Sequence, residues 1–185
     1  DLRMSRGLGD VYKRQALSAL ALTSGSVFAA DSGDGTVKFT GEIVDTPCVL
    51  SVDSQKQEVV LGQVQKSVFT AAGAKSPSKP FEIKLEDCDT GSGKTKVKVG
   101  FNGVGDSDSN GELVSVSTEA GAATGVGIGI YDNTNTLIKL NSGEAETALK
   151  DGQTVLYFTA NYVSTKDTVT TGYGNAEVDF NLSYE

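Results

Sequence analysis

The sequence predicts an all-β protein folded as an antiparallel sandwich, and three observations support this. Beyond residue 30 the apolar residues recur at every second position, which is the period of a β-strand. Clusters of Gly, Ser, Thr, Asn and Asp separate these alternating runs at short intervals, as turns do in a sandwich. The chain has 185 residues with 22 glycines and only 3 prolines, a length that suits one domain.

Each expected strand is an alternating run between two turn-like clusters. The runs cover residues 37–43, 49–52, 59–64, 81–85, 97–101, 113–116, 126–130, 137–140, 156–162 and 178–184. We expect residues 137–140 to pair with residues 126–130 across the polar turn at 132–135. Two Ala-containing segments, 71–74 and 145–150, are expected to form helical turns.

Composition argues against enzymatic and nucleic-acid functions. The sequence has no histidine, which removes Ser-His-Asp and Cys-His catalysis and most zinc sites. The first 29 residues carry four basic and two acidic side chains, so the formal net charge of −8 becomes −10 for the remainder. Such a surface repels phosphate backbones. We therefore expect no enzyme activity, no metal or other cofactor, no small-molecule substrate and no nucleic-acid partner.

Residues 16–29 have the pattern of a secretory signal peptide. Residues 16–22 are apolar apart from one serine, and a basic pair precedes them. Val27 and Ala29 place small residues at the −3 and −1 positions of a cleavage site, so we expect cleavage after Ala29, with Ala30 as the alternative. The run is too short to span a bilayer. The competing interpretation is a short buried helix.

Residues 1–15 do not resemble a normal signal-peptide start. Asp1 and Asp10 are unusual there, and Met4 is internal. We interpret this segment as a cloning, sequencing or assembly scar that replaces the true start.

Cys48 and Cys88 are the two cysteines of the chain. Cysteines of an exported chain usually pair, so we predict a disulfide between them, with two free buried thiols as the alternative. Closing a loop of about 41 residues stabilises a fold by roughly 4 kcal/mol on the chain-entropy account. The implied route passes through the periplasm to the cell surface.

Residues 91–95 (GSGKT) match only the end of a phosphate-binding loop. The full pattern requires a glycine at position 88, which is a cysteine, and a helix after Lys94. Residues 96–101 instead alternate as a strand does. We interpret the segment as a turn.

Residues 106–111 (DSDSNG) resemble the start of an EF-hand calcium loop. The twelfth position of that loop should be a bidentate glutamate, but it is Ser117. The flanking segments alternate as strands do. We interpret the segment as a polar surface loop, with a weak surface calcium site as the alternative.

Four segments, in order, resemble the major subunits of type 1-like, chaperone–usher fimbriae. The first is TVKFTGEIVDTPC at residues 36–48, an alternating run with a glycine followed by a cysteine. LGQV at 61–64 and FEIKLEDCDT at 81–90 follow. The fourth is the end of the chain, with tyrosine as the penultimate residue and a glycine fourteenth from the end. The resemblance covers essentially all of residues 30–185.

This resemblance implies an incomplete immunoglobulin-like β-sandwich that lacks its seventh strand. The gap leaves exposed core and unpaired backbone groups, which is an aggregation hazard. In the family a periplasmic chaperone fills the gap first. At an outer-membrane usher, the N-terminal strand of the next subunit then replaces the chaperone by β-strand addition, and identical or related subunits form an open head-to-tail fibre.

The resemblance also assigns residues. It implies an N-terminal donor strand at residues 30–45 and a pilin sandwich at residues 46–185. The donor side chains are Val37, Phe39, Gly41 and Ile43, with Gly41 where space is tight. The C-terminal acceptor edge, which also contacts the chaperone, is Val178, Phe180, Leu182 and Tyr184, and the region begins at Gly172.

The function that follows is a structural pilus subunit that supports cell adhesion. One alternative is a minor fimbrial adaptor or adhesin; a two-domain adhesin would need roughly twice this length, since a domain takes about 100–200 residues. The other alternative is a free periplasmic immunoglobulin-like binding domain, in which the 37–43 strand belongs to its own sandwich.

Overall fold

A computed structural model describes residues 35–185. The predicted scar at 1–15, the signal peptide at 16–29 and the first residues of the 30–45 segment lie outside the described residues. The chain divides into one unit that ends at Gly41 and a second unit, Glu42–Glu185. Residues 35–41 form no strand, whereas the second unit is the sandwich. No helix within residues 35–185 is long and apolar enough to cross a membrane.

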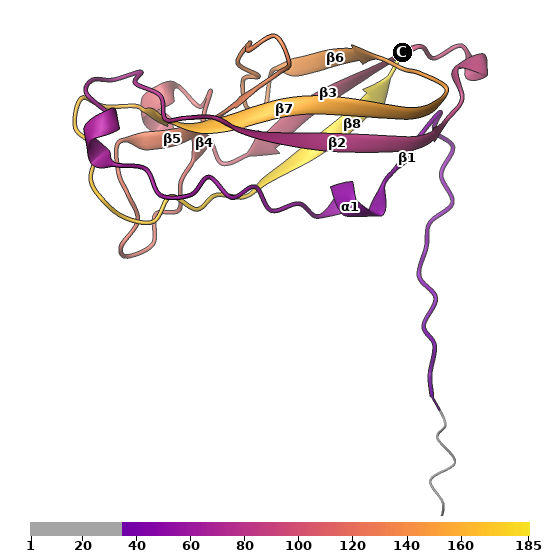
Figure 1. The fold of residues 1–185 in the computed structure, drawn as a ribbon, viewed down its shortest axis with the longest axis horizontal. Helices are drawn as coiled ribbons and strands as arrows, with labels where there is room; N and C mark the ends of the chain where they lie inside the picture. Colours follow the sequence, from indigo (N-terminus) through magenta and orange to yellow (C-terminus); the bar gives the residue numbers. More distant parts are fainter. Residues whose placement is uncertain (1–34) are drawn as a thin grey trace, which may run out of the picture. The chain divides into compact units, whose positions relative to one another are not determined.

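Two antiparallel sheets make up the second unit (Figure 1). The first sheet has the strand order β1-β2-β7-β5-β4 and the second has the order β6-β3-β8. The strands are β1 (Val49–Leu50), β2 (Lys79–Cys88), β3 (Lys96–Gly103), β4 (Val114–Ser115), β5 (Val126–Tyr131), β6 (Glu144–Ala148), β7 (Gly152–Ser164) and β8 (Val178–Tyr184). The helical turns are α1 (Val52–Gln55), η1 (Lys66–Val68), η2 (Thr90–Ser92) and η3 (Ser107–Ser109). The predicted all-β sandwich is confirmed.

The core lies between the inward faces of the two sheets. Strands β2 and β7 form the longest ladder, from Lys79 opposite Ala160 to Leu85 opposite Thr154. Strand β3 pairs with β6 on one side and β8 on the other. Three phenylalanines pack together in the core. The ring centroid of Phe158 lies 5.4 Å from the ring centroids of both Phe81 and Phe101. The most deeply buried aliphatic side chains are Ile83, Leu85, Val97, Val99 and Leu156.

The predicted disulfide between Cys48 and Cys88 is present. It joins the chain just before β1 to the last residue of β2, and both cysteines are buried. The backbone N–H of Asp89 also donates to the carbonyl of Pro47 at 2.8 Å. The covalent and hydrogen-bonded links together fix where residues before Cys48 leave the sandwich.

Several expectations about secondary structure were wrong. Residues 37–43 form no strand within the chain, and residues 137–140 contribute only a single bridge, Leu137 opposite Tyr131, in place of the expected strand. Residues 145–150 do not form a helical turn, because most of them belong to β6, where Ala145 is buried between the exposed Glu144 and Glu146. Pairing with β3 outweighs the helix preference of this segment. Residues 59–64 form no strand and run as irregular chain.

We expect that replacing both cysteines with alanine lowers the free energy of unfolding by about 4 kcal/mol, because the 40-residue separation is no longer closed in the unfolded chain. Guanidinium unfolding of the two proteins measures the difference. A reducing agent should destabilise the wild type by a similar amount and leave the double variant unchanged. Equal unfolding midpoints for all four samples would contradict the prediction.

Candidate functional site: an apolar groove between two open sheet edges

The two sheets are both open along the same side of the sandwich. Strand β8 ends the second sheet, and its only ladder partner among the described residues is β3. On the first sheet, β1 is two residues long and pairs with β2 only at Glu86 and Leu85. Most of β2 therefore lacks a strand on that side. Open edges of this kind present backbone N–H and C=O groups to any added strand.

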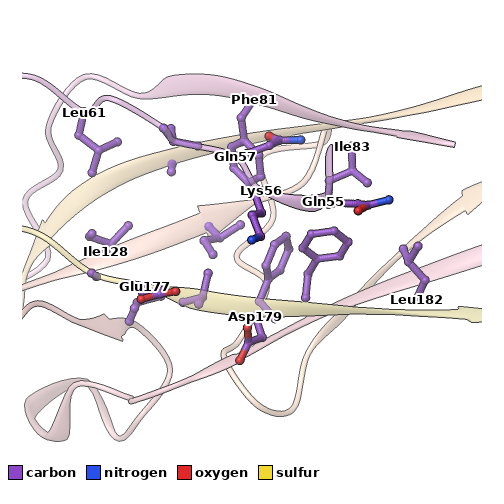
Figure 2. A pocket seen from close by; sticks show the side chains of 18 of the residues that line it. Gln55, Lys56, Gln57, Leu61, Phe81, Ile83, Ile128, Glu177, Asp179 and Leu182 are labelled. Atoms are coloured by element: carbon purple, nitrogen blue, oxygen red, sulfur yellow. The ribbon is translucent and has the colours of Figure 1, made fainter. Parts of the chain in front are cut away.

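An apolar groove of about 690 Å³ lies between these two edges (Figure 2). The floor of the groove consists of core side chains from both sheets, and an added strand between the two edges would cover them. The apolar lining comprises Leu50, Val59, Leu61, Phe81, Ile83, Phe101, Val114, Ile128, Ile130, Ala160, Ala176, Val178, Phe180 and Leu182. Figure 2 shows Ile83 and Leu182 at one end and Leu61, Ile128 and Glu177 at the other.

The wall opposite β8 is the irregular segment that follows α1, and it is held by few hydrogen bonds. The Gln57 side-chain amide donates to the carbonyl of Glu82 at 2.6 Å. Before it, the N–H of Lys84 donates to the Ser54 hydroxyl at 2.9 Å. Beyond Gln57 no strand ladder fixes residues 58–64. A segment with so few backbone bonds rearranges at low cost, so this wall can adjust to an inserted chain.

The rim of the groove is polar and carries both signs of charge. Glu177 and Asp179 lie on the β8 side, and Lys56 lies on the other side (Figure 2). Within residues 35–185 no cluster of three acidic or cysteine side chains is arranged to hold a metal ion. An apolar floor under a charged rim suits a peptide strand with alternating side chains.

The structure brings the predicted acceptor residues of β8 to the groove. Val178, Phe180 and Leu182 line it, and their neighbours along the strand point outward and are exposed. Tyr184 packs against the same core at the end of the strand, and burial raises the pKa of its phenol. All four side chains are therefore placed where a strand added beside β8 would contact them.

Gly172 lies apart from the groove, in the loop between β7 and β8. A Cβ at this position would lie 2.4 Å from backbone atoms of Ala122 and Ala123. The glycine therefore allows two loops to pack closely. It lines a second hollow, described below, and not the groove itself.

The predicted donor residues are exposed. Phe39 is 90% exposed, Val37 is 74% exposed, and Ile43 is fully exposed. A Cβ at Gly41 would meet nothing within 4 Å.

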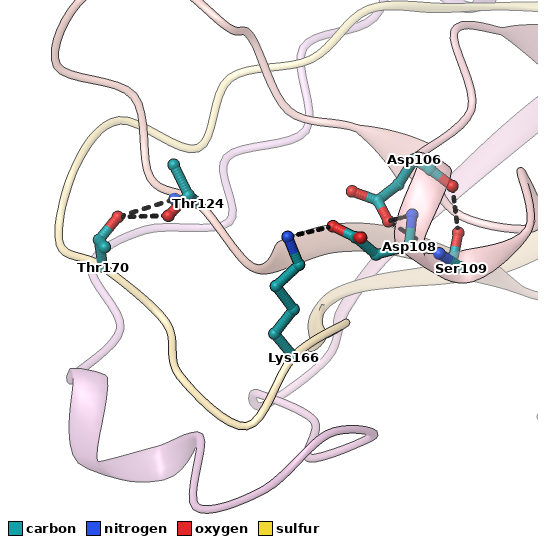
Figure 3. Close-up of polar contacts among 6 residues, drawn as sticks. All are labelled: Asp106, Asp108, Ser109, Thr124, Lys166 and Thr170. Atoms are coloured by element: carbon teal, nitrogen blue, oxygen red, sulfur yellow. Dashed lines mark hydrogen bonds and ion pairs between the residues drawn. The ribbon is translucent and has the colours of Figure 1, made fainter.

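Neither of the two loop motifs has a binding geometry. Gly93 ends η2 in a left-handed turn, and the chain continues directly into β3, so no helix follows to hold a phosphate. In the 106–111 loop, the Asp106 carboxylate accepts the N–H groups of Asp108 and Ser109, and Asp108 pairs with Lys166 at 3.0 Å (Figure 3). One oxygen of each of these carboxylates already has a partner within the protein.

Most of the groove is not predictable from the sequence. Its floor includes Val114, Ile128 and Ile130, whose periodicity is that of ordinary core residues. The wall residues Val59 and Leu61 were predicted to lie in a strand. Periodicity shows that a side chain faces inward, but only the strand order shows whether another strand covers it.

Comparison with known proteins identifies the family. Residues 37–185 match the profile of the fimbrial protein family, described as "Fimbrial protein". The probable major fimbrial subunit LpfA of Escherichia coli O157:H7 is 78% identical over 170 residues, covering 92% of this chain and 94% of that protein. Long polar fimbria protein A of Salmonella typhimurium is 74% identical over the same shares.

Solved structures agree with the sequence relatives. The P pilus rod subunit PapA superposes with a TM-score of 0.62 at 30% identity, covering 76% of this chain and 100% of that chain. A subunit of a chaperone–usher pilus superposes with a TM-score of 0.67 at 32% identity, covering 83% and 97%.

The open, two-sheet architecture is thus the incomplete immunoglobulin-like sandwich of pilus subunits. The chain belongs to the fimbrial protein family. It is a structural subunit of a surface pilus of the chaperone–usher type, exported to the cell surface.

We expect Gly172→Ala to lower the free energy of unfolding by about 1–3 kcal/mol, because the added methyl group must displace the Ala122–Ala123 backbone. Thermal unfolding of the unpolymerised subunit measures the effect. Gly35→Ala is the matched control, since a Cβ there meets nothing within 4 Å. Equal melting temperatures for both variants would show that the two loops separate without cost.

Proposed function

We propose that Val37, Phe39, Gly41 and Ile43 of one subunit fill the groove of the next subunit and complete its sandwich. The observation that carries this proposal is the coincidence of an open apolar groove with an exposed alternating segment in one chain. The groove lacks a covering strand, and the segment has exposed apolar side chains that no part of the described chain covers. Inserted side chains would gain about 25 cal/mol for every Å² of apolar surface removed from water.

The inserted strand runs antiparallel to β8. Every ladder in the described part of the chain is antiparallel, and antiparallel pairing is slightly more stable per residue. Val37 then lies at the Leu182 end of the groove and Ile43 at the Ala176 end. Gly41 falls beside Val178, which supplies the partner-based reason for its small size.

A subunit cannot serve its own groove in this orientation. Cys48 is fixed beside the end of β2, and β1 lies at the same end of the sandwich as the C-terminus (Figure 1). Five residue steps separate Ile43 from Cys48 and reach about 17 Å when fully extended. The seven residues of β8 alone span about 20 Å, and the Ala176 end lies beyond them. The donor must come from another copy.

This arrangement assigns the parts of the chain. Residues 30–45 are the donor strand and residues 46–185 are the acceptor sandwich, preceded by a signal peptide at 16–29 that directs export. The periplasmic chaperone covers the groove until the usher brings the next subunit. Because each copy donates at one end and accepts along its side, the product is an open fibre. The role is structural and not enzymatic.

We expect Phe39→Asp to stop fibre growth, because a carboxylate would be placed unpaired in an apolar groove. The variant should remain soluble in complex with the chaperone. Electron microscopy of surface fibres and the ladder of SDS-resistant oligomers measure assembly. Lys38→Asp is the matched control, because position 38 lies on the opposite face of the donor strand and should still assemble. Normal fibres from Phe39→Asp would remove this residue from the donor strand.

We expect the mature subunit to form SDS-resistant ladders, and a subunit without residues 30–45 to form none. Size analysis of both proteins over a range of concentrations measures this. If the full-length protein is also a monomer and no more stable than the truncated one, residues 37–43 fill neither groove. A full-length monomer that is more stable than the truncated one at every concentration would mean that the strand occupies its own groove.

A further inference from the structure

A second hollow of about 550 Å³ continues the groove beyond the start of β8. The walls are continuous in sequence: the groove wall containing Leu61 passes into Gly62, and Ala176 is preceded by Asn175. Strand β5 contributes Ile128 to the groove and Val126 to the hollow. The hollow is lined by Gly62, Gln63, Val64, Lys66, Phe69, Ala123, Val126, Tyr162, Val169, Thr170, Thr171, Gly172, Tyr173, Gly174 and Asn175.

The wall of the hollow formed by residues 170–175 is held firmly against residues 117–124. Thr124 N–H donates to the Thr170 hydroxyl at 2.9 Å, and the two hydroxyls lie 3.0 Å apart (Figure 3). The backbone of Tyr173 pairs with Gly121 and Ala123 at 2.9 Å. Gly172 closes this contact. The hollow is therefore already formed in the free subunit.

The hollow is open to solvent on one side. Val126 and Val169 are buried at its base in a small apolar cluster against which Phe69 and Tyr162 pack. The Tyr162 hydroxyl is occupied, because it donates to the carbonyl of Gly174 at 3.0 Å. Tyr173, in contrast, is 73% exposed at the margin. An exposed aromatic beside a preformed apolar hollow is typical of an interface.

We propose that this hollow, with Tyr173 and Lys66 at its margin, is a second contact between successive subunits, and that it receives the Cys48 end of the donor's sandwich. The inference rests on the proposed strand exchange. A donor strand that runs antiparallel to β8 leaves the groove at its Ala176 end, where the hollow begins. The next donor residues, 44–47, lead directly into the donor's own sandwich at Cys48. This short connection places that end of the donor's sandwich within reach of the hollow.

Charge supports the same occupant. Lys66 is the one charged residue that lines the hollow, and it forms none of the ion pairs found within residues 35–185. The Cys48 end of the sandwich carries more acidic than basic side chains, since Asp45, Asp87, Asp89 and Asp151 lie there with Lys94 and Lys150. Asp151 holds this end together by accepting the Thr90 N–H and hydroxyl, which lower the pKa of its carboxyl. An acidic end facing Lys66 is electrostatically matched.

The test separates strand insertion from contact between the sandwiches. A synthetic peptide of residues 35–43 carries the donor strand but no sandwich, so it probes the groove alone. We compare its ability to displace the chaperone from wild-type, Tyr173→Ser and Lys66→Glu subunits. We then compare the rates at which fibres of the same proteins dissociate in guanidinium. Tyr157→Ser is the matched control, because Tyr157 is an exposed tyrosine on β7 that lines neither hollow.

We expect the peptide to displace the chaperone equally from all four proteins. Fibres of Tyr173→Ser should dissociate about tenfold faster than wild type, and those of Tyr157→Ser at the wild-type rate. Lys66→Glu should also accelerate dissociation, with a difference that shrinks as salt is added.

Two results would overturn the proposal. If the peptide displaces the chaperone but the Tyr173→Ser and Lys66→Glu fibres dissociate at the wild-type rate, the hollow is not a subunit contact and strand exchange stands. If the peptide fails to displace the chaperone from the wild-type subunit, strand exchange through residues 37–43 fails, and the second contact loses its basis with it.

Discussion

The absent strand beside β8 is the constraint on which the rest of this structure depends. A sandwich stabilises itself by covering the inward faces of its sheets, and here the side chains of Phe81, Ile83 and Phe101 line a groove that no strand of the described chain covers. This exposed apolar surface is removed from water only when another chain supplies the strand. In the proposed assembly, the strand that completes the sandwich of one subunit also links that subunit to its neighbour.

The remaining edges are protected against the same kind of addition. Strand β6, at the far edge of the second sheet, carries the exposed Glu144 and Glu146, and Glu146 is paired with Lys96. A hydrogen bond from Lys96 lowers the pKa of the Glu146 carboxyl and keeps it charged. Strand β4, at the far edge of the first sheet, is two residues long. Charged and short edges discourage pairing, so strand addition is directed to the groove.

The disulfide and the hollow lie at opposite ends of the sandwich, and this gives the proposed strand addition a direction along the fibre. The link between Cys48 and Cys88 fixes the donor segment to one end of the sandwich, while the groove opens toward the hollow near η1 at the other end (Figure 1). A subunit attached in this way is placed end to end with its neighbour and not side by side. Strand exchange alone would leave the two sandwiches joined by residues 44–47, whereas a seated end would restrict their relative motion.

The sequence by itself determined the two-sheet class, most strands and the disulfide, because these follow from a period of two and from two cysteines in an exported chain. It also singled out residues 37–43 and the inward face of β8. It failed at residues 59–64, 137–140 and 145–150, where local preference and tertiary pairing disagree. Only the tertiary structure decided which inward faces stay uncovered, since alternation is the same for a covered and an uncovered strand. The groove, the position of Gly172 and the hollow beside Tyr173 depend on strand order and loop packing, which join residues far apart in the chain.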